Sequence, residues 1–183
     1  MWFMKLKYPF AICFLIFFLF TSVELIAQEE VTVTSHSDVD SSDLALIDND
    51  GKLIKLSEMK GKVIVLNFWA TWCQPCIAEL PSLEKLYSSL ASEEDIVFAA
   101  VEMDQDPEKA AKFFKKRKYS IPLYSLGSAL PSQMQTNSIP MTVIIAKNGE
   151  IVVKKIGMID FGSAKLRNNL LQLTKERADI SYL

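Results

Sequence analysis

The alternation of apolar and polar residues divides the chain into parts of different character. Residues 8–23 carry no charge and are dominated by Phe, Leu and Ile, whereas residues 28–43 are polar without a sustained apolar period. From residue 44 onward, apolar runs are separated by turn residues, as in a folded domain. The predicted parts are a leader (1–27), a flexible linker (28–43), one domain (44–178) and a short C-terminal tail (179–183).

Within the domain, the pattern predicts strands that alternate with helices. Residues 63–69 and 96–101 are nearly continuous apolar runs, which are typical of strands buried on both faces. Apolar positions at helical spacing predict three helices: from Cys73 to about Leu90, from Pro107 to about Lys118, and over residues 163–176.

Two hairpins are expected at the ends of this pattern. Residues 44–56 and 141–156 each hold two short apolar runs around a turn sequence, DNDG and KNGE respectively. The stretch between the second helix and the second hairpin is expected to be a connector. Strands alternating with helices imply a mostly parallel sheet with antiparallel strands added by the late hairpin. The expected fold class is α/β: a central mixed sheet flanked by helices, with an N-terminal β-hairpin extension.

The N-terminal apolar run has the features of an export signal. Lys5 and Lys7 lie before it, and its 16 uncharged residues fall short of the roughly 20 that span a bilayer. Ala27 offers a cleavage point, but Leu25 breaks the small-x-small rule, so an uncleaved membrane anchor stays open. Cys13 is not preceded by a lipobox, which disfavours a lipoprotein. We expect a periplasmic or otherwise extracytoplasmic protein, held to the membrane only if the leader remains.

Charge and cysteine content narrow the function. Without residues 1–27 the chain has 18 basic and 21 acidic residues and no basic stripe, which gives no indication of nucleic-acid binding. Only Cys73 and Cys76 then remain, and the loop between them is too short to stabilise the fold much, so a static clip is a weaker interpretation than redox chemistry. A zinc site needs four ligands, and only His36 in the linker could add to the pair.

The position of the cysteine pair favours thiol–disulfide chemistry. Cys73 follows a buried strand and begins a helix, where unpaired N–H groups and the helix dipole stabilise a thiolate and lower its pKa. Pro75 suits the first helical turn. We expect an exposed Cys73 that attacks substrate and a sheltered Cys76 that resolves the mixed disulfide. The pair itself carries the electrons, so no bound cofactor or metal is expected.

The segment VLNFWATWCQPC, residues 65–76, resembles the active site of thioredoxin-like proteins, most closely the exported TlpA/ResA branch. Asp50-Gly51-Lys52, Gly61-Lys62, Ser138–Thr142 and Asn148-Gly149-Glu150 also fit this branch, and the likeness covers roughly residues 44–175. It implies a protein disulfide oxidoreductase that reduces disulfides of exported client proteins, with cytochrome c maturation as one role. Because its compartment is oxidising, such a reductase implies a membrane thiol–disulfide electron donor.

The resemblance also implies a substrate-binding site. Pro140 would follow a cis peptide bond beside the redox pair and leave the Ile139 backbone free to pair with an extended substrate chain; the alternative is a trans proline that opens a strand. Trp72 and Pro75 would belong to the same docking surface. Met141 would either shape this groove or pack in the core.

Glu79 is the predicted proton relay. It lies one helical turn after Cys76, where a partly buried carboxyl would have a raised pKa and could accept the Cys76 proton; the alternative is a solvated helix residue. Asn67 stands where thioredoxins carry a buried Asp, so it cannot share that role and could be structural. Pro81 is expected to kink the helix. Trp69 and Trp72 are expected to cover the site and not to take part in the chemistry.

Other functions stay open at this point. The reduction potential sets the direction of exchange, so a disulfide oxidase or isomerase of the same fold is an alternative. A binding or chaperone module with an inactive disulfide is another. A peroxidase of the peroxiredoxin type is disfavoured, because Ala70 and Leu66 stand where that chemistry needs Thr or Ser and a Pro.

Overall fold

The computed structural model describes residues 44–176. The predicted leader, the linker with His36 and the C-terminal tail lie outside the described residues. In chain order the elements are β1 (Ala45–Asp48), β2 (Leu53–Lys55), the 3-10 helix η2 (Leu56–Met59), β3 (Val63–Trp69), α2 (Gln74–Ser89), β4 (Ile96–Glu102), α3 (Pro107–Arg117), β5 (Leu123–Leu126), the 3-10 helix η3 (Ser132–Met134), β6 (Met141–Ile145), β7 (Ile151–Ile156) and α4 (Ala164–Lys175). The three predicted helices agree with α2, α3 and α4 to within one residue at each end.

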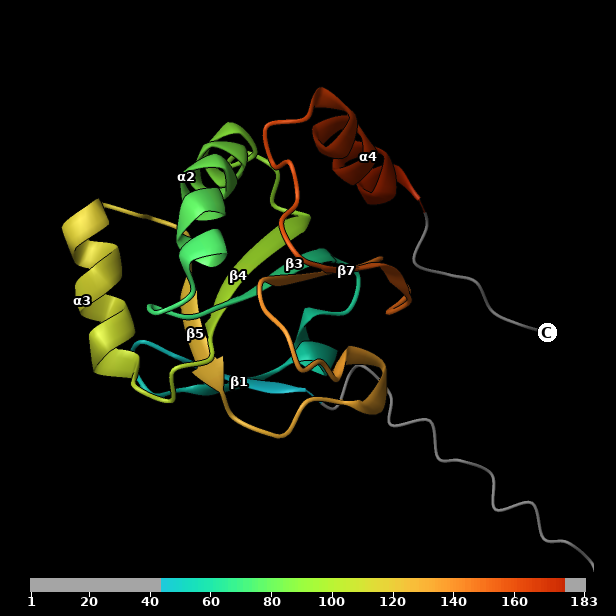
Figure 1. The fold of residues 1–183 in the computed structure, drawn as a ribbon. Coiled ribbons are helices and arrows are strands. Elements are labelled where there is room, and N and C mark those ends of the chain that lie inside the picture. Colours follow the sequence, from blue (N-terminus) through green and yellow to red (C-terminus); the bar gives the residue numbers. More distant parts are fainter. Residues whose placement is uncertain (1–43, 177–183) are drawn as a thin grey trace, which may run out of the picture. The chain divides into compact units, whose positions relative to one another are not determined.

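The strands form one seven-stranded sheet in the order β2-β1-β5-β4-β3-β6-β7 (Figure 1). The pairs β3–β4 and β4–β5 are parallel, whereas β1–β2, β1–β5, β3–β6 and β6–β7 are antiparallel. The expected mixed sheet is confirmed. The expectation that the sheet is mostly parallel is wrong. Each edge of the sheet is a hairpin, and two strands joined by a short turn can only pair antiparallel.

The connector predicted after α3 contains a strand, β5, which the sequence analysis missed. Leu123–Leu126 is only four residues long and mostly half-buried, so its pattern is too short to indicate a strand. The segment forms a strand because it fills the space between two others: it pairs parallel to β4 and antiparallel to β1. Tertiary pairing decides its conformation.

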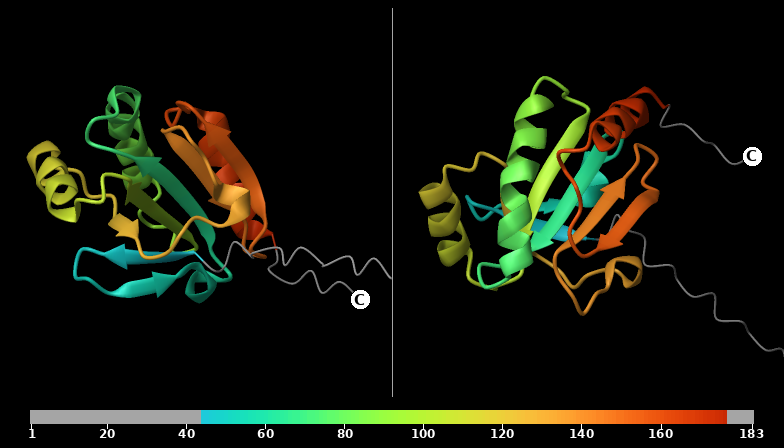
Figure 2. Two further views of the ribbon diagram at one scale, coloured as in Figure 1. Left: turned by 60° about the horizontal axis from the view of Figure 1, so that its bottom comes forward. Right: turned by 45° about the horizontal axis from the view of Figure 1, so that its top comes forward.

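All three described α-helices cover the same face of the sheet. In the right view of Figure 2, α3, α2 and α4 stand side by side in front of the strands. The crossovers β3-α2-β4 and β4-α3-β5 step across the sheet in the same direction, and right-handed crossovers then place both helices on one face. The opposite face has its own core, which includes Leu56 of η2 and Met134 of η3.

Strand β3 lies in the interior of the sheet, between β4 and β6, and leads directly to the cysteine pair. All seven of its residues are buried, which confirms the prediction of a strand covered on both faces. Helix α2 follows with Pro75 in its first turn and continues through Pro81 to Ser89. The kink predicted at Pro81 stays a prediction. Within residues 44–176, no helix is long and apolar enough to cross a bilayer.

Candidate active site

Cys73 and Cys76 are joined in a disulfide at the start of α2. Cys73 is the N-cap residue of the helix, and its Sγ accepts a hydrogen bond from the Cys76 backbone N–H at 3.3 Å. This is the position where a helix terminus stabilises negative charge on sulfur. The structure thus places the pair where the sequence predicted it, with Cys73 at the dipole-stabilised end.

The exposed fractions of the two cysteine residues differ less than predicted. Cys73 is 4% exposed and Cys76 is fully buried. The expectation that Cys73 faces solvent is therefore wrong for this oxidised form. As the N-cap residue, Cys73 directs its sulfur toward the first turn of α2 and into the disulfide, while the neighbouring Trp72 is 64% exposed.

A hydrogen-bonded clasp holds the loop that leads from β3 to Cys73. The backbone N–H and the hydroxyl of Thr71 donate to the Asp104 carboxylate at 2.7 and 2.8 Å, and Lys109 Nζ lies 3.1 Å from it. Burial alone would raise the pKa of Asp104, but these three donors outweigh it and hold the pKa below its usual value of 3.8. Sequence reasoning missed Asp104. The one signal for it in the sequence was its position just after a buried strand.

The Ile139–Pro140 peptide bond is cis, which confirms the prediction. Strands β3 and β6 are antiparallel, with Phe68 opposite Met141. Pro140 therefore enters the sheet at the same end at which β3 exits toward Cys73. The Pro140 carbonyl accepts a hydrogen bond from Gly157 N–H at 2.8 Å, which fixes the segment after β7 beside this loop.

Glu79 lies inside the domain, one helical turn after Cys76. It is 2% exposed, and burial raises its pKa above the usual 4.5, in the predicted direction. Two donors partly offset this effect: Asn67 Nδ2 at 2.8 Å on Oε1 and the Ile159 backbone N–H at 3.1 Å on Oε2. The alternative of a solvated helix residue is excluded, since the carboxyl is covered and held on both oxygens.

Asn67 joins three elements around Glu79. From β3, its Nδ2 donates to Glu79 on α2 and lies 3.3 Å from Thr142 Oγ1 on β6. Its Oδ1 is buried without a hydrogen-bond partner. Asn67 is thus a structural neighbour of the acid, as the sequence analysis allowed.

Comparison with known proteins identifies this arrangement. The family model called Redoxin matches residues 28–167. The chain belongs to the Redoxin family. Within it, the chain is similar to a thiol-disulfide oxidoreductase ResA of Bacillus cereus, with 30% identity over 119 residues, 64% of this chain and 68% of that protein. With the disulfide at Cys73-x-x-Cys76, this redoxin is a thiol–disulfide oxidoreductase of the ResA type.

Solved structures support the same fold. A thioredoxin-like protein from Porphyromonas gingivalis has a TM-score of 0.57 and 25% identity, over 73% of this chain and 90% of that one. StoA from Bacillus subtilis, with a TM-score of 0.53, 23% identity and coverage of 68% and 92%, shows the fold alone. The thioredoxin-like fold expected from the sequence is confirmed.

The two tryptophans near the redoxin's cysteines have different environments. Trp69 is fully buried and packs on Phe113 and Phe114 of α3, with ring centroids 5.4 and 5.0 Å apart. Trp69 belongs to the same core cluster as Cys73 and Cys76, and the expectation that it covers the site stays a prediction. Trp72 lies in the loop beyond the strand and is exposed.

Apolar side chains near Pro140 fall into two groups. Met141 is fully buried in the core on the opposite face from the helices, so packing is its role and it does not line a groove. Ile156 and Met158 are about half exposed on either side of Gly157, whose N–H binds Pro140. The sequence analysis did not single out these two residues, although apolar residues just after Lys154 and Lys155 were a signal.

Proposed function

We propose that this redoxin reduces disulfide bonds in exported proteins outside the cytoplasm. The observation that carries the proposal is the disulfide at the start of α2, with Cys73 as the N-cap residue and a buried acid, Glu79, one turn beyond Cys76. The name of its relative, thiol-disulfide oxidoreductase, supports the reaction class. The signal-like residues 1–27 support an extracytoplasmic location.

In the first step, the reduced enzyme attacks the client. The Cys73 thiolate, stabilised by the N–H groups of the first helical turn, displaces one sulfur of the client disulfide. A Cys73–client disulfide forms, and the displaced client sulfur leaves as a thiolate and takes up a proton from solvent. Trp72, Pro75, Ile139 and Pro140 hold the client chain against the pair, the first through exposed apolar surface and Ile139 through its backbone.

In the second step, Cys76 releases the client. Its thiol gives a proton to the Glu79 carboxylate, and the resulting thiolate attacks the Cys73 sulfur. The second client sulfur leaves as a thiolate and is protonated. Two electrons have then passed from the enzyme dithiol to the client disulfide, and the enzyme is left in the oxidised state seen here.

The cycle closes when a second thiol pair reduces the enzyme disulfide. In an oxidising compartment, a membrane thiol–disulfide protein is the fitting donor. No bound cofactor enters either step, since the cysteine pair carries both electrons. Clients of this chemistry are exported chains with a disulfide that must be opened, and a cysteine pair awaiting haem attachment during cytochrome c maturation is one such case.

The direction of exchange is tested by the reduction potential of the Cys73–Cys76 couple. A potential near that of thioredoxin, about −270 mV, supports client reduction. A potential near about −120 mV, as in strong oxidants, overturns it in favour of client oxidation. The order of attack is tested with a disulfide-containing client: Cys76→Ser should accumulate a covalent enzyme–client species, and Cys73→Ser should not.

A further inference from the structure

A second buried carboxyl lies at the end of β4 and takes no part in the proposed reaction. Glu102 is 2% exposed, and its Oε2 has no hydrogen-bond partner. In the sheet it lies between Trp69 of β3 and Ser125 of β5. A buried carboxylate without a hydrogen-bond donor is unfavourable, so such a group in the lining of a pocket indicates a missing donor.

Glu102 lines a pocket of about 510 Å³ between the start of α3 and the ends of β5 and β1. In Figure 1 the first turn of α3 and the arrowhead of β5 lie at the same end of the domain. Ile47, Leu126 and Ala129 give the pocket apolar walls, and Ser125 and Ser128 add hydroxyl groups. A volume of this size, in the usual range of about 300–1,000 Å³, admits a long side chain.

The charges around the pocket favour a positively charged ligand. None of the nine described residues that line it is basic. Asp104 and Asp106 belong to the segment that follows Glu102, and the Lys109 ammonium on α3 is already bound to Asp104. An ammonium or guanidinium group on a flexible aliphatic stem would give the Glu102 carboxylate a donor and pack its stem on the apolar walls.

Glu102 connects the pocket to the redox loop, residues 70–73, which leads from β3 to Cys73. Glu102 is in register with Trp69, four residues before Cys73, and Asp104 holds the loop through Thr71. A client bound by disulfide to Cys73 therefore extends within reach of this pocket. We propose that the pocket receives a lysine or arginine side chain of the client, close in sequence to the cysteine under attack. This inference rests on the proposed function and adds a substrate preference to it.

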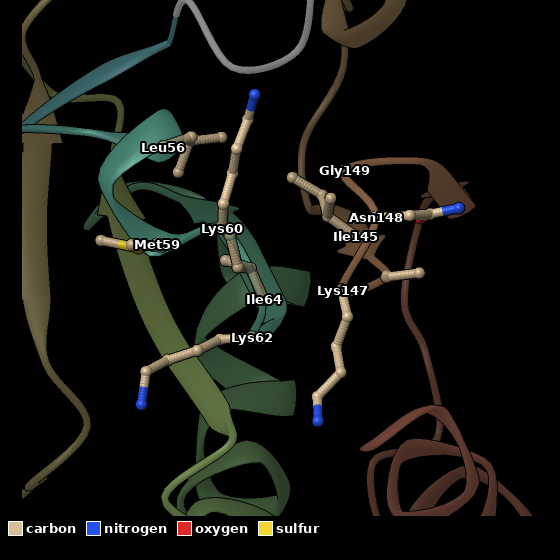
Figure 3. A pocket seen from close by; sticks show the side chains of 10 residues that line it. Leu56, Met59, Lys60, Lys62, Ile64, Ile145, Lys147, Asn148 and Gly149 are labelled. Atoms are coloured by element: carbon tan, nitrogen blue, oxygen red, sulfur yellow. The ribbon is translucent and has the colours of Figure 1, made fainter. Parts of the chain in front are cut away.

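A second pocket offers a contrast and carries no such inference. It lies at the opposite end of β3, measures about 70 Å³ and has Lys60, Lys62 and Lys147 at its wall. Lys62 donates to the Glu94 carbonyl and Lys147 to Asp95 and Thr174. Figure 3 shows the side chains of Lys60 and Lys62 extending in opposite directions, so they do not converge on an anion.

The preference is tested with disulfide peptides that differ at one position. The reduced full-length protein is assayed on peptides with lysine, norleucine or glutamate placed about two to six residues from the cysteine, a span of up to about 20 Å in an extended chain. The lysine peptide should have a kcat/KM about tenfold above the norleucine peptide at one spacing, and the glutamate peptide should be slowest. Equal values at every spacing overturn the inference.

Matched variants assign the preference to Glu102. Glu102→Gln keeps the shape and should abolish the lysine advantage, whereas Glu108→Gln, the same change on exposed α3 surface outside the pocket, should keep it. Ala129→Phe should also abolish it, by filling the pocket from an exposed position that does not depend on the buried carboxyl. A lysine advantage that survives both pocket variants overturns the inference.

A small disulfide separates the two proposals. Hydroxyethyl disulfide is too short to reach the pocket, so all the variants should reduce it at the rate of the unaltered protein. If the unaltered protein itself fails to reduce it, the proposed function fails. If it does reduce it, while the three peptides react equally, only the preference for a basic client residue fails.

Discussion

Asn67 on β3 donates its side-chain N–H to Glu79 on α2 across 2.8 Å. The other Glu79 oxygen accepts from the Ile159 backbone, so both oxygens are held as acceptors in a site where burial opposes their charge. The acid is thereby balanced between two effects: desolvation favours the protonated form, and the two donors favour the ionised form. This balance supports the proposed transfer of a proton from Cys76 to Glu79.

Removing the Asn67 amide should raise the Glu79 pKa further. In Asn67→Ala, burial persists while one of the two stabilising donors is lost, so the ionised form is less favoured. The expected result is a higher midpoint in the carboxyl carbon NMR titration of Glu79, together with a lower rate of mixed-disulfide resolution at neutral pH.

The control for this effect is Thr142→Val. Thr142 contacts the same amide at 3.3 Å but does not bind Glu79, so this change should move the Glu79 midpoint less than Asn67→Ala does. An identical Glu79 titration in the unaltered protein and Asn67→Ala would contradict the balance described above.

Replacing Glu79 with Gln should change how stability depends on pH. A carboxyl whose pKa is raised on folding stabilises the fold below its usual pKa of 4.5, and this stabilisation is lost as the pH rises through the raised value. The glutamine in Glu79→Gln cannot ionise, so this variant does not lose stability in that pH range. Its free energy of unfolding should therefore gain on that of the unaltered protein across this interval, by about 1.4 kcal/mol for each pH unit that the interval spans.

Urea unfolding at a series of pH values measures this difference. Glu108→Gln, the same substitution at an exposed carboxyl, is measured beside it as the matched control. A Glu79→Gln curve that is parallel to that of the unaltered protein would show that Glu79 ionises in the folded protein as readily as in the unfolded chain.

The Asp104 clasp should show the opposite dependence on pH. Its pKa is held below 3.8, so the clasp stabilises the fold above that value and the stabilisation is lost as the pH falls through the lowered pKa. At neutral pH, Asp104→Asn should lower the free energy of unfolding by about 1–3 kcal/mol, because the Thr71 donors and Lys109 lose a charged acceptor.

Denaturant unfolding at neutral and at acid pH tests the clasp. The deficit of Asp104→Asn relative to the unaltered protein should shrink in acid, where Asp104 itself becomes protonated. A constant deficit at both pH values would mean that the Asp104 charge contributes nothing and that shape alone matters.

The sequence predicts those structural features that depend on residues close together in the chain. The seven apolar residues of β3 and the proline at the start of α2 carry their own signals, and both elements lie where they were expected. The chemistry of the cysteine pair follows from its place between them. Strand β5 carries no such signal, since it exists only through the edges of β4 and β1.

The features missed at the site have the same cause. Asp104 and Glu102 are brought beside the redox loop by the parallel pairing of β4 with β3, a contact between residues more than thirty positions apart. Trp69 and Trp72 look alike in the sequence, but the strand ends between them, so one is buried and the other exposed. The apolar pattern of a strand predicts which of its faces is buried. It does not predict which side chains of a neighbouring strand will lie next to it.

Trp72 should contribute to client binding and little to stability. It is 64% exposed, so Trp72→Ala should change the free energy of unfolding by no more than about 0.5 kcal/mol. Exposed tryptophans beside a reactive group commonly anchor a partner, and losing one raises KM more than it lowers kcat. We expect KM for a protein disulfide to rise about tenfold, with the rate on hydroxyethyl disulfide unchanged.

Leu53→Ala is the matched control, because Leu53 is a similarly exposed apolar residue on the edge strand β2, whereas the redox loop extends from the interior strand β3. It should leave KM for the same client unaltered. If both variants raise KM equally, general surface hydrophobicity explains binding. If neither does, the client is held by the Ile139–Pro140 segment and the half-exposed side chains of Ile156 and Met158, and the docking role of Trp72 is wrong.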